Sequence, residues 1–364
     1  MDRVRAMTSE NAGYRTALDD ATVTVTSGRP GRERSSSKTF EDRYKAIDWS
    51  ETQERARLRK GFRLDAPPET VPVGSPFLQQ ACGKSYTGML PVTATPSAIL
   101  TTFHDDADLL ISLNRSAAEP RLVARSRSLI RDLAPTGQGL LALADHVVCR
   151  VEASGDLVPL TGSPSQPCGV LAVAAGRALW FNDGRLELTD LATGTLEWHR
   201  AVAPELYDGH TDLLTVALSS THLAFAARSG EVVIRSLADG TEMSLEGIDF
   251  PNRMAFWGDF LVVHDLYGKG LAPVGVYSTS TGEPAGWWLP PEGVANYRFA
   301  VSPGGSRLAV GSHCWVTCYR LGQPAAELTF RIDHAVRGAG LAWDGEDALL
   351  ARVDAGFIAA YRVS

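Results

Sequence analysis

Seven pairs of short apolar runs are the feature of this 364-residue chain that most limits its fold. Within each pair, a polar or glycine-containing turn joins one run to the next, which is typical of antiparallel hairpins. Turn glycines follow four of the pairs at Gly194, Gly240, Gly282 and Gly322, with spacings of 46, 42 and 40 residues. A repeat of about 40 to 45 residues with four strands predicts the blades of a β-propeller.

The seven predicted hairpins are Leu109–Asn114 with Arg121–Arg125, His146–Val151 with Asp156–Leu160, Ala178–Phe181 with Leu186–Leu191, Leu223–Ala227 with Val232–Leu237, Phe260–Asp265 with Val274–Ser278, Leu308–Gly311 with Val316–Leu321, and Leu349–Val353 with Phe357–Val363. The segment from Tyr207 to Glu246 gives the clearest single unit, because it holds four apolar runs separated by three turn signals. Two of these turns contain glycine after a small polar residue, which supplies the positive φ of a tight hairpin turn.

Several segments resemble the repeats of WD40-like (quinoprotein or YVTN-type) β-propellers in a divergent form. Asp208-Gly209-His210 stands before a first strand, as the opening Gly-His pair of that family does. Asp190-Leu191-Ala192-Thr193-Gly194 and the run from Val301 to Ala309 also look like its recurrent segments. Ser236 replaces the aspartate that the family pairs with the opening histidine, so the resemblance, which covers about residues 95 to 364, implies a fold and no particular partner.

The sequence therefore predicts an all-β protein: a β-propeller of seven blades with four antiparallel strands each, over residues 85–364. Gly162–Pro167 offers no clear outer strand for the second blade, which leaves six or eight blades as alternatives. The last repeat, Gly338–Ser364, ends after three strands. We expect Tyr86–Thr93 to complete it and remove an exposed sheet edge, with Ala21–Ser27 as the competing candidate.

Residues 1–84 form a separate N-terminal extension, because they do not share the later period. Ala21–Ser27 alternates as a half-buried strand does, and Gly28–Ser37 has the composition of an exposed linker. Ser50 and Gln53 form a capping-box pattern that predicts a short helix ending before Gly61. Residues 28 to 63 carry a net charge of +5, against −12 for the remainder.

Composition restricts the class of function. The formal net charge of −7 disfavours binding of nucleic acid, except through the basic N-terminal arm. The five cysteines have no regular spacing, which favours a reducing compartment, and we expect the cytoplasm. Met1–Asp20 lacks the apolar region of a secretion signal, and no run approaches the length of a membrane span.

No motif predicts a metal, a cofactor or a catalytic residue. The acidic turn from His104 to Asp108 lacks the pattern of a Ca²⁺ loop, and Cys314 and Cys318 are too far apart along a strand to bind one zinc ion. His264 and Asp265 are adjacent in a strand and should point to opposite faces, which favours structural roles. Gly83-Lys84-Ser85 lacks the earlier glycine of a phosphate-binding loop.

Two functions of different classes remain. The first is a non-catalytic scaffold for protein partners, acting as a subunit of a multiprotein assembly; the second is a propeller hydrolase or lyase with a site in the central channel. We expect the scaffold, because the innermost positions are mostly apolar or small. The links into the innermost strands carry polar and aromatic residues suited to a protein partner. The predicted partner-binding residues are Tyr207, Asp208, His210, Asn252, Arg253, Tyr297, Arg298, His334 and Arg337.

Overall fold

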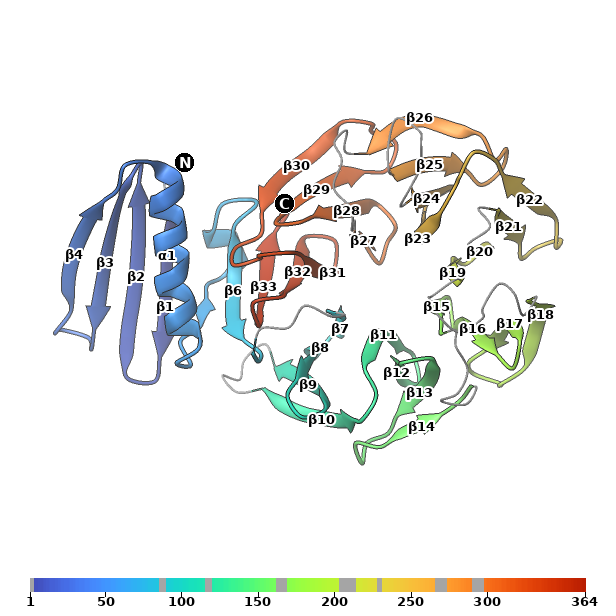
Figure 1. Ribbon diagram of the computed structural model, residues 1–364, viewed down its shortest axis with the longest axis horizontal. Helices are drawn as coiled ribbons and strands as arrows, with labels where there is room; N and C mark the ends of the chain where they lie inside the picture. Colours follow the sequence, from blue (N-terminus) through green and yellow to red (C-terminus); the bar gives the residue numbers. More distant parts are fainter. Residues whose placement is uncertain are drawn as a thin grey trace.

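The protein is an all-β propeller with a folded N-terminal unit beside it, as the computed structural model shows (Figure 1). The structure describes residues 3–84, 90–114, 120–161, 169–202, 214–227, 231–265, 274–289 and 298–364. These residues form eight antiparallel sheets, of which one belongs to the N-terminal unit and the others surround the centre of the ring. Neither the α-helix nor the short 3₁₀ helix η1 (Pro68–Thr70) of the described residues is long and apolar enough to cross a membrane.

The sheets of the ring are numbered as blades in chain order, and each is given from its innermost strand outward. Blade 1 holds β7 (Val92–Ala94), β8 (Ala98–His104), β9 (Asp108–Asn114) and β10 (Arg121–Ser126). Blade 2 holds β11 (Ile130–Thr136), β12 (Gly139–Ala144), β13 (Val147–Val151) and β14 (Leu157–Pro159). Blade 3 holds β15 (Leu171–Ala174), β16 (Arg177–Asn182), β17 (Arg185–Asp190) and β18 (Leu196–Ala201).

The remaining blades follow the same order. Blade 4 holds β19 (Leu214–Leu218), β20 (His222–Ala227), β21 (Val232–Ser236) and β22 (Glu242–Leu245). Blade 5 holds β23 (Pro251–Trp257), β24 (Phe260–Asp265), β25 (Val274–Ser278) and β26 (Pro284–Leu289). Blade 6 holds β27 (Arg298–Val301), β28 (Arg307–Ser312), β29 (Trp315–Arg320) and β30 (Ala326–Arg331). Blade 7 holds β31 (Ala339–Asp344), β32 (Ala348–Val353), β33 (Phe357–Arg362), β6 (Pro76–Ala81) and β5 (Leu64–Asp65).

All seven predicted hairpins are antiparallel strand pairs in the structure. In blades 1 and 2 they are the third and outermost strands, and in the other blades they are the second and third. Blade 2 has an outer strand after all, although β14 is only three residues long. Gly162–Pro167, which made this blade doubtful from the sequence, lies outside the described residues.

The strand that closes the ring is β6, so both predicted closing strands are wrong. β6 pairs with β33 from the C-terminal end of the chain. Of the expected segment Tyr86–Thr93, residues 86–89 are not described, and Val92–Ala94 forms the innermost strand of blade 1. The competing segment, Ala21–Ser27, is a strand as predicted, but β3 (Thr22–Gly28) lies in the N-terminal sheet.

The N-terminal unit consists of a four-stranded sheet and one helix. The sheet has the order β1 (Arg3–Ser9), β2 (Ala12–Asp19), β3 and β4 (Arg34–Thr39), and α1 (Arg43–Leu58) packs against β2 and β3. The segment Gly28–Ser37, expected to be an exposed linker, thus overlaps the first part of β4, a strand whose residues are all exposed.

The helix of this unit exists as predicted but begins earlier. Its N-cap is Asp42, whose carboxylate accepts a hydrogen bond from the Lys45 backbone N–H at 2.8 Å, and not Ser50. Ser50 lies inside the helix and is buried, so it cannot form the expected capping box. Its hydroxyl instead donates to the buried carboxylate of Glu54 at 3.1 Å.

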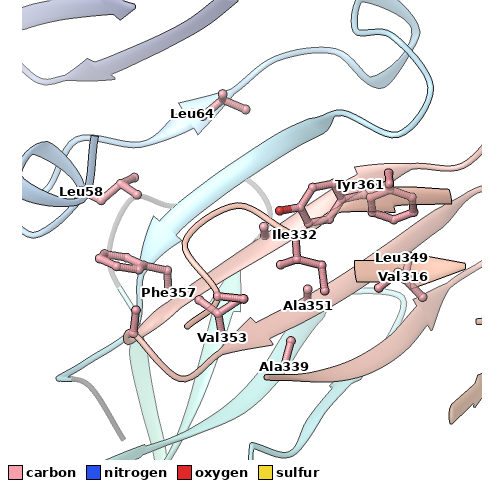
Figure 2. Close-up of a cluster of buried hydrophobic side chains, with 14 of the residues drawn as sticks. Leu58, Leu64, Val316, Ile332, Ala339, Leu349, Ala351, Val353, Phe357 and Tyr361 are labelled. Atoms are coloured by element: carbon pink, nitrogen blue, oxygen red, sulfur yellow. The ribbon is translucent and has the colours of Figure 1, made fainter. Parts of the chain in front are cut away.

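One continuous apolar core joins the N-terminal unit to blades 6 and 7 (Figure 2). Leu58 at the end of α1 and Leu64 of β5 belong to the same buried cluster as Phe357 and Tyr361 of β33. Such a shared core fixes the N-terminal unit to the ring, because separating the two would expose apolar surface to water.

Candidate functional site

Carboxylates hold the links that lead into the innermost strands of three blades. Asp265 accepts hydrogen bonds from the backbone N–H groups of Asp249 and Phe250, at 2.9 and 2.8 Å. Asp354 does the same for Val336 and Arg337, at 3.0 and 2.8 Å. These bonds satisfy backbone donors that no strand pairs, so the links have a fixed shape.

Blade 2 uses a similar arrangement, in which Asp145 accepts a hydrogen bond from the Leu129 N–H at 3.2 Å. Sequence reasoning missed this role of the three aspartates. The sequence did contain a signal for this role, because each aspartate ends or directly follows the second strand of its blade: β12, β24 or β32. We call the surface formed by the links into the innermost strands the linker rim.

Five of the nine predicted partner-binding residues fall in the described part of the chain. Tyr207, Asp208, His210 and Tyr297 lie outside it. Arg337 is exposed on the linker rim, beside Val336, whose exposed fraction is 63%. Arg253, the third residue of β23, is half-buried. Neither arginine forms an ion pair with another described residue, so both guanidinium groups can bind an incoming acceptor.

His334 does not lie on an accessible surface, which corrects its prediction as a partner-binding residue. Its exposed fraction is 1%, and its ring contacts Phe357 with 5.4 Å between ring centroids. Its Nε2 atom is 3.8 Å from a carboxylate oxygen of Glu54 in α1. Burial lowers the pKa of His334 to about 4, although the charges of Asp333 and Glu51 act in the opposite direction. The residue belongs to the contact between the N-terminal unit and the ring.

A buried network of charged groups surrounds His334 at this contact. Arg3 and Arg5 of β1 approach Asp333 at 3.6 and 3.1 Å, and Gln79 of β6 donates to the same carboxylate at 3.0 Å. Burial tends to raise the pKa of Asp333, but the two guanidinium groups hold it well below its ordinary value. On the other side, Glu51 pairs with Arg331 and Arg3. Each buried charge thus has a counter-charge, as a stable buried network requires.

Asn252 and His264 lie together between blades 5 and 6. The Asn252 Nδ2 atom is 3.4 Å from His264 Nδ1, and the His264 ring lies edge-on to Phe299, with 6.3 Å between centroids. Burial lowers the pKa of His264 to about 4. Asp265 faces the link before β23 instead, so the adjacent histidine and aspartate have separate partners, as their alternation in the strand predicts.

The acidic turn after β8 is held by contacts within the protein. His104 Nδ1 is 2.7 Å from an Asp108 carboxylate oxygen, and the other oxygen accepts from the Ile130 N–H of blade 2 at 2.7 Å. Asp105 forms an ion pair with Lys84 at 2.6 Å. Among the residues that the structure describes, no group of three or more His, Cys, Asp or Glu side chains is placed to hold a metal ion.

Two innermost strands carry opposite charges that sequence reasoning did not connect. Asp132 is the third residue of β11 in blade 2, and Arg298 is the first residue of β27 in blade 6. The positive charge of Arg298 acts on Asp132, and the negative charge of Asp132 acts on Arg298. Arg298, predicted to bind a partner, is half-buried at the start of β27. Since 166 residues separate the two, no local pattern could relate them.

Solved structures with a similar fold have low sequence identity to this chain. The computationally designed protein Ika8 matches 78% of this chain and 99% of its own, with a TM-score of 0.53 and 14% identity. BamB from Moraxella catarrhalis matches 78% of this chain and 85% of its own, with a TM-score of 0.51 and 17% identity.

PorZ, a component of the type-IX secretion system of Porphyromonas gingivalis, matches 79% of this chain with a TM-score of 0.54 and 15% identity, and this chain covers 38% of PorZ. BamB and PorZ are propeller-type proteins, so the likeness shows the fold. No protein-family model and no curated protein matches the sequence.

Proposed function

We propose that the protein is a non-catalytic, WD40-like scaffold in the cytoplasm that binds protein partners through its linker rim, as a subunit of a multiprotein assembly. The observation that carries the proposal is the exposed pair Val336 and Arg337 on a link whose backbone Asp354 holds in place. Arginine next to an exposed apolar side chain on a rigid link is typical of residues that dominate interface energy.

Two further observations support this proposal. PorZ is a component of a secretion system, and it has a propeller of similar fold, so a ring of this kind is compatible with work in an assembly. The described cysteines, Cys82, Cys149, Cys314 and Cys318, are all free thiols, which suits a reducing compartment.

Affinity capture from the cell of origin, followed by mass spectrometry, tests the scaffold. We expect the double variant Arg253→Ala with Arg337→Ala to capture the native partner at least tenfold less well, about 1.4 kcal/mol, without a lower melting temperature. Arg121→Ala on the outer strand β10 is the matched control, because Arg121 is an exposed arginine far from the linker rim.

Unchanged capture by the double variant would refute the linker rim as the binding surface. A loss of capture in a variant with Arg29, Arg32 and Arg34 replaced by alanine would then move the surface to the basic N-terminal unit. These three arginines are exposed, and their replacement leaves the shared core intact.

A further inference from the structure

β4 is the open edge of the N-terminal sheet. It has a neighbouring strand on one side only, where it pairs with β3 from Ser27 opposite Arg34 to Thr22 opposite Thr39, and all six of its residues are exposed. Figure 1 shows β4 at the end of the N-terminal unit that points away from the ring. An edge strand in such a place offers unpaired backbone N–H and C=O groups to another extended chain.

The register of β3 and β4 identifies the unpaired backbone groups. The Phe40 N–H donates to the Ala21 carbonyl at 2.9 Å, which continues the pairing of the two strands by one residue. In an antiparallel ladder, residues that bond to one neighbouring strand alternate with residues that face the other side. Ser35, Ser37 and Thr39 therefore direct their backbone N–H and C=O groups away from β3, along the free edge.

The two faces of β4 carry different side chains. On the face away from α1, three pairs of hydroxyl groups join β4 to β3, with 2.8 to 3.0 Å between their oxygens. On the other face, Lys38 stands opposite Val23, which is buried against α1. The Lys38 ammonium lies over the rings of Phe40 and Trp49, at 4.9 and 5.4 Å from their centroids. These contacts position the charge of Lys38 beside the edge, on the same face as Arg34.

The edge is also basic. Residues 29–39 contain four exposed cations, Arg29, Arg32, Arg34 and Lys38, and one acidic residue, Glu33, which gives a net charge of +3. No ion pair of the described residues includes any of the four cations. Their charges are therefore available to attract an acidic partner.

These charges distinguish among the possible occupants of the edge. A second copy of this chain would bring its own Arg34 and Lys38, with no acidic residue of β4 to compensate them, so like charges oppose self-pairing. A nucleic acid would neutralise the cations through its phosphates, yet it has no regular series of donors and acceptors to pair with a strand edge. An extended acidic peptide matches both features, because its backbone pairs with the edge and its carboxylates with the cations.

We propose that β4 binds an extended segment of an acidic protein partner by strand addition. The backbone of the segment would hydrogen-bond to Ser35, Ser37 and Thr39. Its carboxylates would occupy alternate positions, so that they lie on the α1 face beside Arg34 and Lys38, and small or β-branched side chains would lie beside the hydroxyl groups. This surface is separate from the linker rim, and the inference does not depend on binding there.

Peptides with matched sequences test the proposal by fluorescence anisotropy on the full chain. The first peptide has about eight residues and alternates glutamate with threonine or valine. The second has lysine in place of glutamate. We expect the acidic peptide to bind at least tenfold more tightly than the lysine peptide, and its affinity should fall as salt is added.

Two further peptides carry backbone N-methyl groups, which distinguish strand addition from simple attraction of charges. The N–H groups that would face β4 belong to threonine and valine. N-methylation of these residues should abolish binding, because it removes the donors and blocks the approach of the two chains. N-methylation of the glutamates lies on the side away from β4 and should leave most of the affinity.

Variants of the protein locate the binding surface. Ser37→Pro removes an N–H that faces outward, so it should abolish peptide binding while the pairing with β3 remains. Ser37→Ala keeps this N–H and is its control. Arg34→Ala with Lys38→Ala should weaken binding of the acidic peptide at least tenfold. Its matched control replaces two exposed arginines of the ring, Arg121 and Arg185, by alanine.

The proposal is wrong if N-methylation of threonine and valine leaves the affinity unchanged, a result that does not depend on how any variant folds. It is also wrong if the lysine peptide binds as tightly as the acidic one. Tighter binding of a single-stranded RNA than of the acidic peptide would overturn it in favour of nucleic acid. The linker rim has no part in these measurements, so the two surfaces can fail separately.

Discussion

Blade 7 and blade 3 each have a hairpin as their second and third strands, but the burial of their outer strands differs. In blade 7, five of the six residues of β33 are buried, and β6, β5 and the N-terminal unit cover its outer side. In blade 3, the outermost strand β18 has five exposed residues out of six. The repeat thus sets the shape of each blade, while the contact of β33 with β6 and the N-terminal unit concentrates buried residues in blade 7. We expect the local stability of the blades to differ in the same way, with blade 7 more stable than blade 3.

Of the changes considered, deletion of residues 1–81 should have the largest effect on the stability of blade 7. It removes the N-terminal unit and β6, which leaves the backbone groups on the outer edge of β33 unpaired and the shared core exposed to water. We expect an insoluble protein, or one without a cooperative thermal transition in calorimetry.

Deletion of residues 1–62 keeps β5 and β6 and should give a soluble ring with a lower melting temperature. Equal melting temperatures for the full chain and the 1–81 deletion would show that blade 7 needs no closing strand.

Leu58→Ala should have a smaller but clear effect, because Leu58 is fully buried between α1 and the ring. Truncation of a buried leucine removes apolar contacts and leaves a cavity, which costs about 3 kcal/mol of the free energy of unfolding. Denaturant unfolding followed by tryptophan fluorescence measures this change. Thr52→Ala, at an exposed position of the same helix, should change the free energy by less than about 0.5 kcal/mol. Equal effects of the two substitutions would argue against a shared core.

The smallest predicted effect concerns pH and compares two buried histidines. In the folded protein, the pKa of His334 at the N-terminal contact and of His264 between blades 5 and 6 is about 4. Between their ordinary pKa of about 6.5 and this value, the unfolded chain binds protons that the folded chain does not. The free energy of unfolding should therefore fall as the pH falls, by about 2 kcal/mol per histidine from pH 7 to pH 5.

His334→Asn should remove the contribution of one histidine and leave that of His264. Asparagine suits the position, because His334 has a positive φ of 66°, which asparagine tolerates better than most residues. Urea unfolding at pH 7 and pH 5 measures the difference for both proteins. A variant with the same pH dependence as the unmodified protein would mean that His334 does not contribute to it.

The ring was predictable from the sequence because its hairpins carry a local signal. Each second and third strand has apolar residues bounded by turn residues, and the turn glycines recur at a nearly constant spacing. The rim residues Arg253 and Arg337 could likewise be placed from their positions before or at the start of an innermost strand. Such signals depend only on neighbours in the chain.

The closing strand was not predictable in this way, because its buried residues do not alternate. Leu78, Gln79 and Gln80 are all buried in β6, and Gln79 is polar. Gln79 donates a hydrogen bond there to Asp333, which is 254 residues away in sequence. The same reason hid which face of α1 is buried, because the buried residues of this helix include Glu51 and Glu54, whose arginine partners lie on β1 and blade 6. A buried polar residue looks like a surface residue until its distant partner is known.

The pairing of β6 with β33 has a consequence for synthesis on the ribosome. β6 leaves the ribosome well before β33, because β33 lies far later in the sequence. Until then β6 has no neighbour on the side where β33 will pair, and the N-terminal unit lacks the blade 6 and blade 7 residues of its core. Contacts between such distant segments form slowly, and an unpaired strand edge promotes aggregation. The nascent chain should therefore depend on chaperones until β33 emerges, and a messenger RNA that ends before the codons of β33 should yield an aggregating product even when six blades have been made.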